Sequence, residues 1–127
     1  MATVLLYNIR EEARRRKIGA ALFRAALPFR EVTPEEQGKT LGELLGVPGA
    51  AEAAENPGEP FAEEMIVMHG LNPRQFQTFL EALKQQQIRV PLKAVVTEHN
   101  IQWSSLRLHS ELAVEHRAMT EGKAPVH

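Results

Sequence analysis

The sequence contains no cysteine, only one tryptophan and one tyrosine, and no long apolar run. Without cysteine, thiol catalysis, thiolate zinc sites and disulfide bonds are excluded. The apolar run near the start, Val4 to Tyr7, is far too short for a signal peptide or a membrane span. We therefore expect a cytoplasmic protein with no membrane partner.

Charge of one sign is also lacking overall, because the formal net charge of the 127 residues is -1. This balance does not favour nucleic acid as a partner. The charges are unevenly distributed, however. The first quarter carries Arg10, Arg14, Arg15, Arg16, Lys17 and Arg24, whereas nine glutamates and the single Lys39 lie between Glu31 and Glu64. This pattern predicts either two solvated faces or a bipolar surface suited to self-association or to a small anion.

The apolar pattern predicts one domain built from two similar halves. Residues 1–46 form the first half, 47–63 an Ala/Glu/Pro/Gly linker, 64–120 the second half and 121–127 a tail. Each half reads strand, helix, strand, helix. The predicted strands cover residues 3–7, 29–32, 65–68 and 92–97, and the last helix covers roughly residues 104–119. Thr33 and Asn72 supply caps for the helices that follow them.

Two short segments repeat in the same order of residue types. LPFREVT ends at Thr33, and VPLKAVVT ends at Thr97. In this alignment Phe29 matches Leu92 and Arg30 matches Lys93. Because proline suits the entry of a strand and threonine caps a following helix, the repeat favours an internal βαβα duplication.

The predicted fold class is α/β. The strands at 3–7 and 65–68 are apolar at successive positions, so helices should cover both faces of the sheet. Right-handed crossovers then give a four-stranded, mainly parallel sheet of order 2-1-3-4. The alternative is a ferredoxin-like α+β fold, in which one sheet face is bare.

A mainly parallel sheet of this order places a ligand crevice beyond the carboxyl ends of its two central strands. The residues expected there are Asn8, Arg10 and Arg14 after the first strand, and His69, Gly70, Asn72 and Arg74 after the third. Arginines at helix starts are unfavourable alone, so a phosphate or carboxylate would relieve them. The alternative is that neighbouring glutamates already do so.

No catalytic, metal or cofactor motif survives scrutiny. Gly38-Lys39-Thr40 resembles the end of a phosphate-binding loop, but its first glycine position is Thr33, and Pro34 supplies no N–H. His69 and His99 end neighbouring strands without a zinc-type spacing, and Ser104 and Ser105 are best explained as helix caps. We predict no catalytic residue, no metal and no cofactor.

The stretch that begins at Glu64 contains a Val-Thr-x-x-Asn-x-x-Trp turn before a Leu-rich helix. Its residues are Val96, Thr97, Asn100 and Trp103. This C-terminal half resembles an uncharacterised bacterial family of unknown function, common in Firmicutes. The resemblance implies that Thr97, Asn100 and Trp103 belong to a shared pattern, and it implies no activity.

Two functions remain open from the sequence. The favoured one is a small, non-enzymatic interaction or regulatory module that associates with itself or with a protein partner. Phe23 supports it, because this residue lies off the Ile18–Leu22 stripe of its helix. The alternative is a small anionic-ligand binder, or a weak enzyme, that uses the crevice between the first and third strands.

Overall fold

The computed structural model describes residues 2–52 and 58–120, without the side chains of residues 118–120. The predicted tail, 121–127, and residues 53–57 of the predicted linker lie outside the described residues.

The same order of elements occurs twice along the chain. The first series is β1 (Thr3–Tyr7), α1 (Glu12–Arg24), β2 (Phe29–Val32), the 3-10 turn η1 (Pro34–Glu36) and α2 (Leu41–Leu45). The second is β3 (Met65–His69), α3 (Pro73–Gln85), β4 (Leu92–Val95), the 3-10 turn η2 (Asn100–Gln102) and α4 (Ser105–Thr120). All four predicted strands are therefore present, although β4 ends two residues early.

Side-chain caps mark the starts of α2 and α3, and a glycine marks the end of α2. The side chain of Asn72 accepts a hydrogen bond from the Gln75 backbone N–H at the start of α3, as predicted. The helix predicted from Thr33 onward is instead divided into η1 and α2. A second cap causes the division, because the Thr40 side chain accepts from the backbone N–H of Glu43. Gly46 ends α2 in the left-handed conformation.

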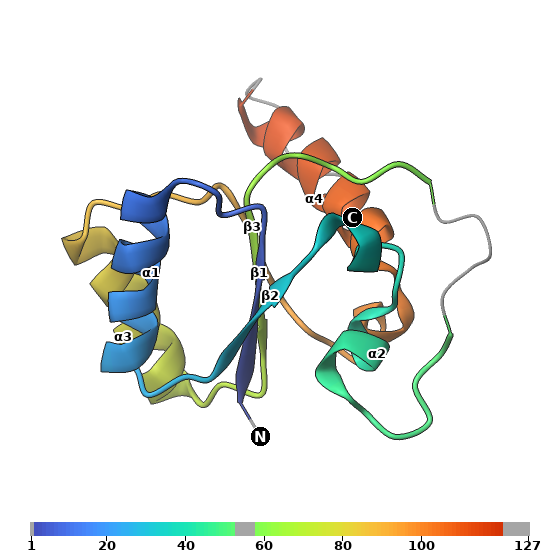
Figure 1. The fold of residues 1–127 in the computed structure, drawn as a ribbon, viewed down its shortest axis with the longest axis horizontal. Coiled ribbons are helices and arrows are strands. Elements are labelled where there is room, and N and C mark those ends of the chain that lie inside the picture. Colours follow the sequence, from blue (N-terminus) through green and yellow to red (C-terminus); the bar gives the residue numbers. More distant parts are fainter. Residues whose placement is uncertain (1, 53–57, 121–127) are drawn as a thin grey trace.

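The sheet has the predicted order, β2-β1-β3-β4, but it is mixed. β1 pairs in parallel with β2, and β3 with β4, whereas the central pair of β1 and β3 is antiparallel. The prediction of a mainly parallel sheet is therefore wrong at its centre. The ferredoxin-like alternative does not hold either, because helices cover both sheet faces (Figure 1).

The direction of β3 follows from where the chain is held before it. A parallel neighbour needs a crossover that returns the chain to the amino end of β1. Here the Asn8 side chain, directly after β1, binds the backbone carbonyls of Phe61 and Glu63. β3 therefore starts where β1 ends, with Tyr7 beside Met65.

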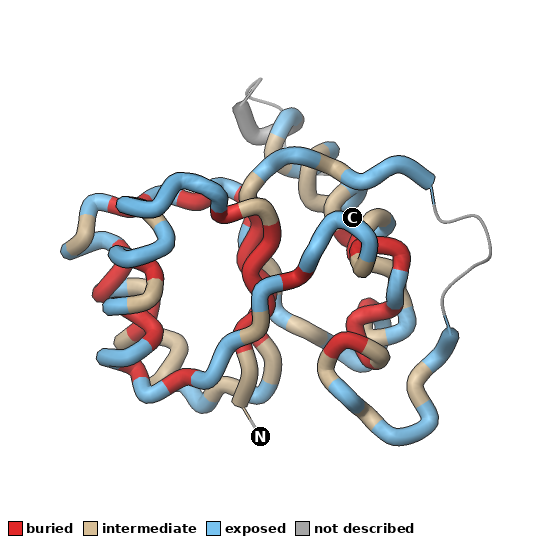
Figure 2. Tube along the Cα trace, viewed as in Figure 1, coloured by how far each residue is buried: buried red, intermediate tan, exposed pale blue. Residues whose placement is uncertain are grey.

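Two helical layers enclose the sheet, which Figure 1 shows edge-on. α1 and α3 pack on one face against Val4, Leu6, Ile66 and Met68. The α2 and α4 helices pack on the other face, where the alternate strand residues Leu5, Tyr7, Met65 and Val67 lie. The buried part of the trace runs through the strands and the inward sides of the helices (Figure 2). The successive apolar residues of β1 and β3 are thus explained by burial on both faces.

The two strand–helix–strand units have similar elements, and their pairing gives a register that differs from the one in the repeated segments. Helices α1 and α3 each have 13 residues. Positive φ angles follow at Ala26 and Gln87. Val4 pairs with Phe29 as Ile66 pairs with Lys93, and both central-strand residues face the same helical layer. By this register Phe29 takes the place of Lys93, one residue after the Leu92 that the repeated segments match to it, although Phe29 and Leu92 each begin their strand.

Candidate functional site

The residues predicted to line one crevice lie at opposite ends of the sheet. Because β1 and β3 are antiparallel, Tyr7 at the end of β1 pairs with the start of β3, and His69 at the end of β3 pairs with Thr3. Two sets therefore separate, with Asn8, Arg10 and Arg14 at one end and His69, Gly70, Asn72 and Arg74 at the other. The prediction of a single crevice that holds both sets is therefore wrong. Anion binding by either set alone stays a prediction.

Each set borders its own hollow. Asn8 and Arg10 line a hollow of about 370 Å³ together with Arg15 and Glu31. Gly70 lines another, of about 470 Å³, whose other lining residues are uncharged and mostly apolar, among them Phe76 and Val95. The first hollow already contains an ion pair, in which the guanidinium of Arg15 lies 2.8 Å from the carboxylate of Glu31.

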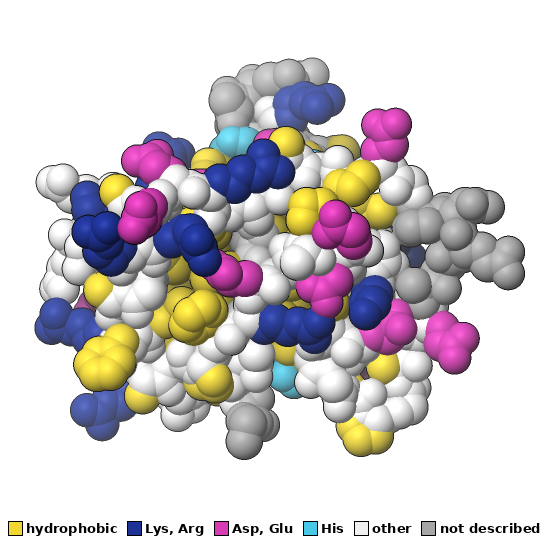
Figure 3. Space-filling model, viewed as in Figure 1, with side chains coloured by type: hydrophobic (Ala, Val, Ile, Leu, Met, Phe, Trp, Pro, Cys, Tyr) yellow, Lys and Arg dark blue, Asp and Glu magenta, His cyan; other side chains and the backbone are white. Residues whose placement is uncertain are grey.

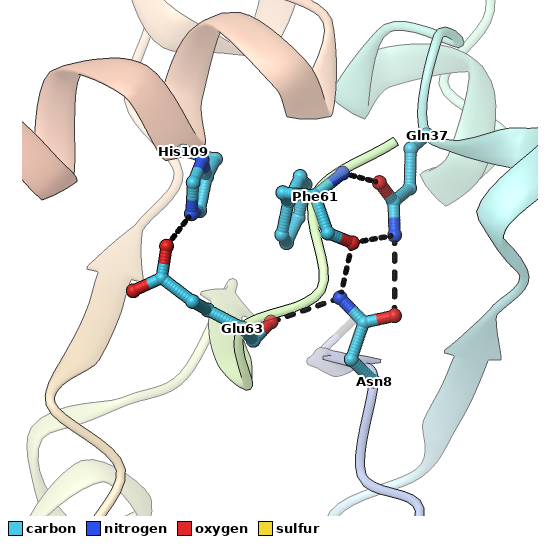
Figure 4. A network of polar contacts seen from close by, with 5 residues as sticks. All are labelled: Asn8, Gln37, Phe61, Glu63 and His109. Carbon is cyan, nitrogen blue, oxygen red and sulfur yellow. Dashed lines mark hydrogen bonds and ion pairs between the residues drawn. The ribbon is translucent and has the colours of Figure 1, made fainter. Parts of the chain in front are cut away.

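Asn8 holds the segment before β3 against the fold. It has a left-handed backbone, with φ 60°, and its Nδ2 donates to the carbonyls of Phe61 and Glu63, each at 2.9 Å. The buried Gln37 completes the arrangement, because its Oε1 accepts from the Phe61 N–H at 2.9 Å. Figure 4 shows these side chains converging on the segment. We call residues 61–63 with Asn8 and Gln37 the clamp.

Helix α4 closes the other side of the clamp. The His109 ring stacks on Phe61 with centroids 4.0 Å apart, and its Nε2 lies 2.9 Å from Oε1 of Glu63 (Figure 4). Beneath it, the hydroxyl groups of Tyr7 and Ser105 share a hydrogen bond of 2.7 Å. Burial raises the pKa of Tyr7, so this phenol stays protonated.

Arg14 also has a structural partner. Its guanidinium donates two hydrogen bonds to the Glu64 carboxylate, at 2.9 and 2.6 Å, and a third to the carbonyl of Arg89. The hydrogen bond with Glu64 raises the pKa of Arg14. The guanidinium therefore has a fork of acceptors within the protein and needs no bound anion to neutralise it.

The second set shows mixed roles. Asn72 caps α3, and Gly70 takes a left-handed backbone with φ 72°, which glycine adopts without strain. His69 and Arg74 make no ion pair within the described residues. His99 follows β4 at this same end, but the described residues contain no group of three or more His, Cys, Asp or Glu side chains able to hold a metal.

The pattern residues of the resembled family form a turn after β4. The Thr97 N–H donates to Oδ1 of Asn100 at 2.7 Å, and the Asn100 N–H donates to Oγ1 of Thr97 at 3.1 Å. Asn100 also donates to the carbonyl of Val95. Trp103 lies under the guanidinium of Arg107, 4.3 Å from its ring centroid. These contacts direct the chain from β4 into α4, which gives Thr97 and Asn100 a structural role.

Lys39 and Thr40, which resemble part of a phosphate loop, serve the same junction. Thr40 is buried, and its hydroxyl donates to the carbonyl of Ala51 at 2.7 Å. The carbonyl of Lys39 accepts from the Ser105 N–H, and the Leu41 N–H donates to the carbonyl of Trp103. The segment is therefore engaged in joining α2 to α4.

Charge divides between the two helical layers. The α1/α3 layer, residues 10–27 and 70–91, contains nine Arg and Lys and three Glu, and two carboxylates outside these ranges, Glu31 and Glu64, pair with its Arg15 and Arg14. In the α2/α4 layer, taken as residues 33–52, 58–63 and 97–117, the numbers are reversed, with three Arg and Lys against nine Glu. On the face shown in Figure 3, cations gather over α1 and most carboxylates over the α2 side. The molecule thus has one basic layer and one acidic layer.

One cluster of cations is not among the site residues predicted from the sequence. Lys84, Arg89 and Lys93 line a hollow beside the end of α3. A signal was present, because no acidic residue lies between Glu81 and Glu98. The sequence does not single out the cluster, because Lys84 belongs to α3, Lys93 to β4 and Arg89 to the segment between them. The fold brings the three cations around one hollow.

The described residues define an α/β domain with a mixed four-stranded sheet. Residues 64–119 match a family model described as Domain of unknown function (DUF3783), which spans β3 to α4. The resemblance to a family of unknown function is therefore confirmed for these residues. Comparison with curated proteins gives no match. No helix among the described residues is long and apolar enough to cross a membrane.

Proposed function

We propose that this chain is a small, non-enzymatic interaction module whose basic α1/α3 layer binds an acidic protein surface. A second copy of the chain supplies such a surface with its own acidic layer. The opposite charges of the two layers carry this proposal. Like-charged layers would repel one another, whereas contact between a basic and an acidic layer is favourable and accelerates association.

Many cations of the basic layer are available to a partner. Arg14, Arg15 and Arg16 have glutamate partners. The other cations of the layer make no ion pair within the described residues: Arg10, Lys17, Arg24, Arg74, Lys84 and Arg89. Their charge is compensated only by solvent and salt until a partner arrives.

Two aromatic side chains are exposed in or next to the basic layer. Phe23 on α1 is 88% exposed, and Phe29 on β2 is 51% exposed. Aromatic side chains contribute strongly to the affinity of an interface when they become buried in it. They would supply the apolar contacts that a purely ionic association lacks.

Sedimentation velocity at low and high salt tests the proposal. We expect association at high micromolar concentration in low salt and a monomer in 1 M salt, where the Debye length falls from about 10 Å at 0.1 M to about 3 Å. Lys17→Glu with Arg24→Glu should abolish the association. A monomer under all conditions would contradict self-association.

A matched pair in the acidic layer controls for net charge. Lys39→Glu with Arg117→Glu changes the net charge by the same amount, but it leaves the basic layer intact. This variant should associate at least as strongly as the wild type, because its acidic layer becomes more acidic. Equal loss in both double variants would show that total charge, not the separation of charge, governs association.

We also propose that the two units arose by internal duplication. Support comes from the equal helices, the matched positive φ angles and a reciprocal pair of hydrogen bonds, Leu41 N to Trp103 O and Ser105 N to Lys39 O. A solved structure in which residues 3–32 and 65–96 fail to superpose would contradict it. Bacterial origin and cytoplasmic location are further proposals, supported by the family resemblance and the lack of cysteine. Cell fractionation tests the location.

A further inference from the structure

A hollow of about 500 Å³ lies between the C-terminal end of α3 and the edge strand β4. Its volume is in the range of small-molecule sites, about 300–1,000 Å³. Leu80, Leu83 and Ile88 provide apolar surface, and three charged residues, Lys84, Arg89 and Lys93, line the rest together with Gln87. No acidic residue lines it. The hollow therefore combines an apolar surface with charge of one sign.

The three cations have no counter-ion within the described residues. The ammonium of Lys93 donates to the carbonyl of Val90 at 2.6 Å, which is a neutral acceptor. Partial burial and then the charge of Arg89 lower the pKa of Lys93. An anion placed between Arg89 and Lys93 would relieve their repulsion.

The fold itself does not require cations at these positions. Lys84 and Lys93 correspond to Phe23 and Phe29 in the first strand–helix–strand unit. The negative end of the α3 dipole favours Lys84 in the last turn, but Lys93 lies on β4 and gains nothing from that position. The fold alone therefore does not explain why both lysines border an apolar hollow.

The hollow beside α1 shows the contrast. There Arg15 and Arg16 line a space of about 330 Å³, but Glu31 and Glu12 line it too and pair with them. Their charges are neutralised within the chain, so that hollow offers little to a bound anion.

We propose that the hollow formed by Leu80, Leu83 and Ile88 with Lys84, Arg89 and Lys93 binds a small amphipathic carboxylate, such as a medium-chain fatty acid. The carboxylate lies between Arg89 and Lys93, and its alkyl chain covers the leucines. Arginine can pair with a carboxylate through two hydrogen bonds, while the apolar chain gains from leaving water. Lys84 and Arg89 also belong to the basic layer, but the carboxylate would bind here whether or not that layer contacts a partner.

Titration of the full chain with decanoate, followed by amide chemical shifts, tests the site. We expect saturable shifts concentrated in residues 80–93. Arg89→Gln with Lys93→Gln should weaken binding by 10-fold or more, because each lost charged hydrogen bond costs about a factor of 10. Decanol, which lacks the charge, should bind at least 10-fold more weakly than decanoate.

Two further variants separate the site from general charge. Lys17→Gln with Arg24→Gln removes the same charge from α1 and should leave decanoate binding unchanged. Arg89→Lys with Lys93→Arg preserves the charges and should retain most of the affinity. Equal binding by the Arg89/Lys93 glutamine variant, shifts centred elsewhere, or equal binding of decanol would each overturn the proposal.

Discussion

Replacing Gln37 tests whether the clamp stabilises the fold. Gln37 is fully buried, and its Oε1 accepts from the Phe61 N–H at 2.9 Å. Its Nε2 makes two longer contacts of 3.4 Å, with the carbonyl of Phe61 and with Oδ1 of Asn8. Gln37→Leu keeps the volume of the side chain almost unchanged but leaves the Phe61 N–H without an acceptor.

The expected loss follows from that one group. An unsatisfied buried N–H costs about 1–3 kcal/mol, and contacts at 3.4 Å contribute little. We therefore expect the free energy of unfolding of Gln37→Leu to fall by about 2 kcal/mol. A cavity contributes little to this value, since leucine fills the same space.

Gln37→Glu gives the same site a dependence on pH. A carboxylate there keeps the acceptor for Phe61, but its other oxygen faces two acceptors, the Phe61 carbonyl and the Asn8 side chain. Only the protonated acid can donate to them, so folding raises the pKa of this glutamate above its unfolded value of about 4.3. The variant should therefore be close to wild type below pH 4 and lose stability as pH rises through the folded pKa.

Urea unfolding followed by the fluorescence of Trp103 measures both effects, with each variant compared to wild type at the same pH. Gln85→Leu and Gln85→Glu are matched controls, because Gln85 is exposed on α3. They should change the free energy of unfolding by less than about 0.5 kcal/mol. A Gln37→Leu variant as stable as wild type, or an equal loss of stability in Gln37→Glu at pH 4 and pH 7, would contradict the proposed role of the clamp.

Two further changes test local features. The Thr33 N–H, and then Arg30, lower the pKa of Glu36, so the carboxylate stabilises the fold above its unfolded pKa of about 4.3 and this stabilisation is lost as pH falls. Glu36→Gln should therefore lower the free energy of unfolding by about 1 kcal/mol at pH 7. A stability difference from wild type in urea unfolding that stays constant down to pH 3 would contradict this. Ala26→Gly should raise the melting temperature by a few degrees, because φ is 55° there and the left-handed penalty of about 1–2 kcal/mol exceeds the entropy cost of glycine. Ala13→Gly within α1 should instead lower the melting temperature. A change in the same direction for both variants would show that Ala26 is not strained.

Local features of the fold could be predicted because their causes are local. The cap at Asn72, the stop at Gly46 and the apolar residues of β1 each depend on a few adjacent residues. The order of the sheet followed from which strands are apolar at successive positions. The direction of β3 did not, because a strand buried on both faces looks the same in either direction.

The candidate site was harder to predict from the sequence than the fold. The predicted crevice required parallel central strands, and the contact that reverses β3 joins Asn8 to carbonyls more than fifty residues away. Every residue has a backbone carbonyl, so the sequence does not show which ones accept a side-chain hydrogen bond. Conversely, the hollow near Lys93 is formed by residues of α3, of β4 and of the segment between them, which the fold brings around one space.

The antiparallel centre has a consequence for any chain that carries only the matched domain. Residues 64–119 begin with β3, whose other edge is paired here with β1. Without β1, the backbone groups on that edge of a fully apolar strand would have no partner, which is a hazard for aggregation. The order and directions of the strands are symmetric about the centre of the sheet, since β1 and β3 are antiparallel and each has a parallel outer neighbour. A lone domain of this type should therefore pair β3 with β3 of another copy, and the present chain carries that pairing within one polypeptide.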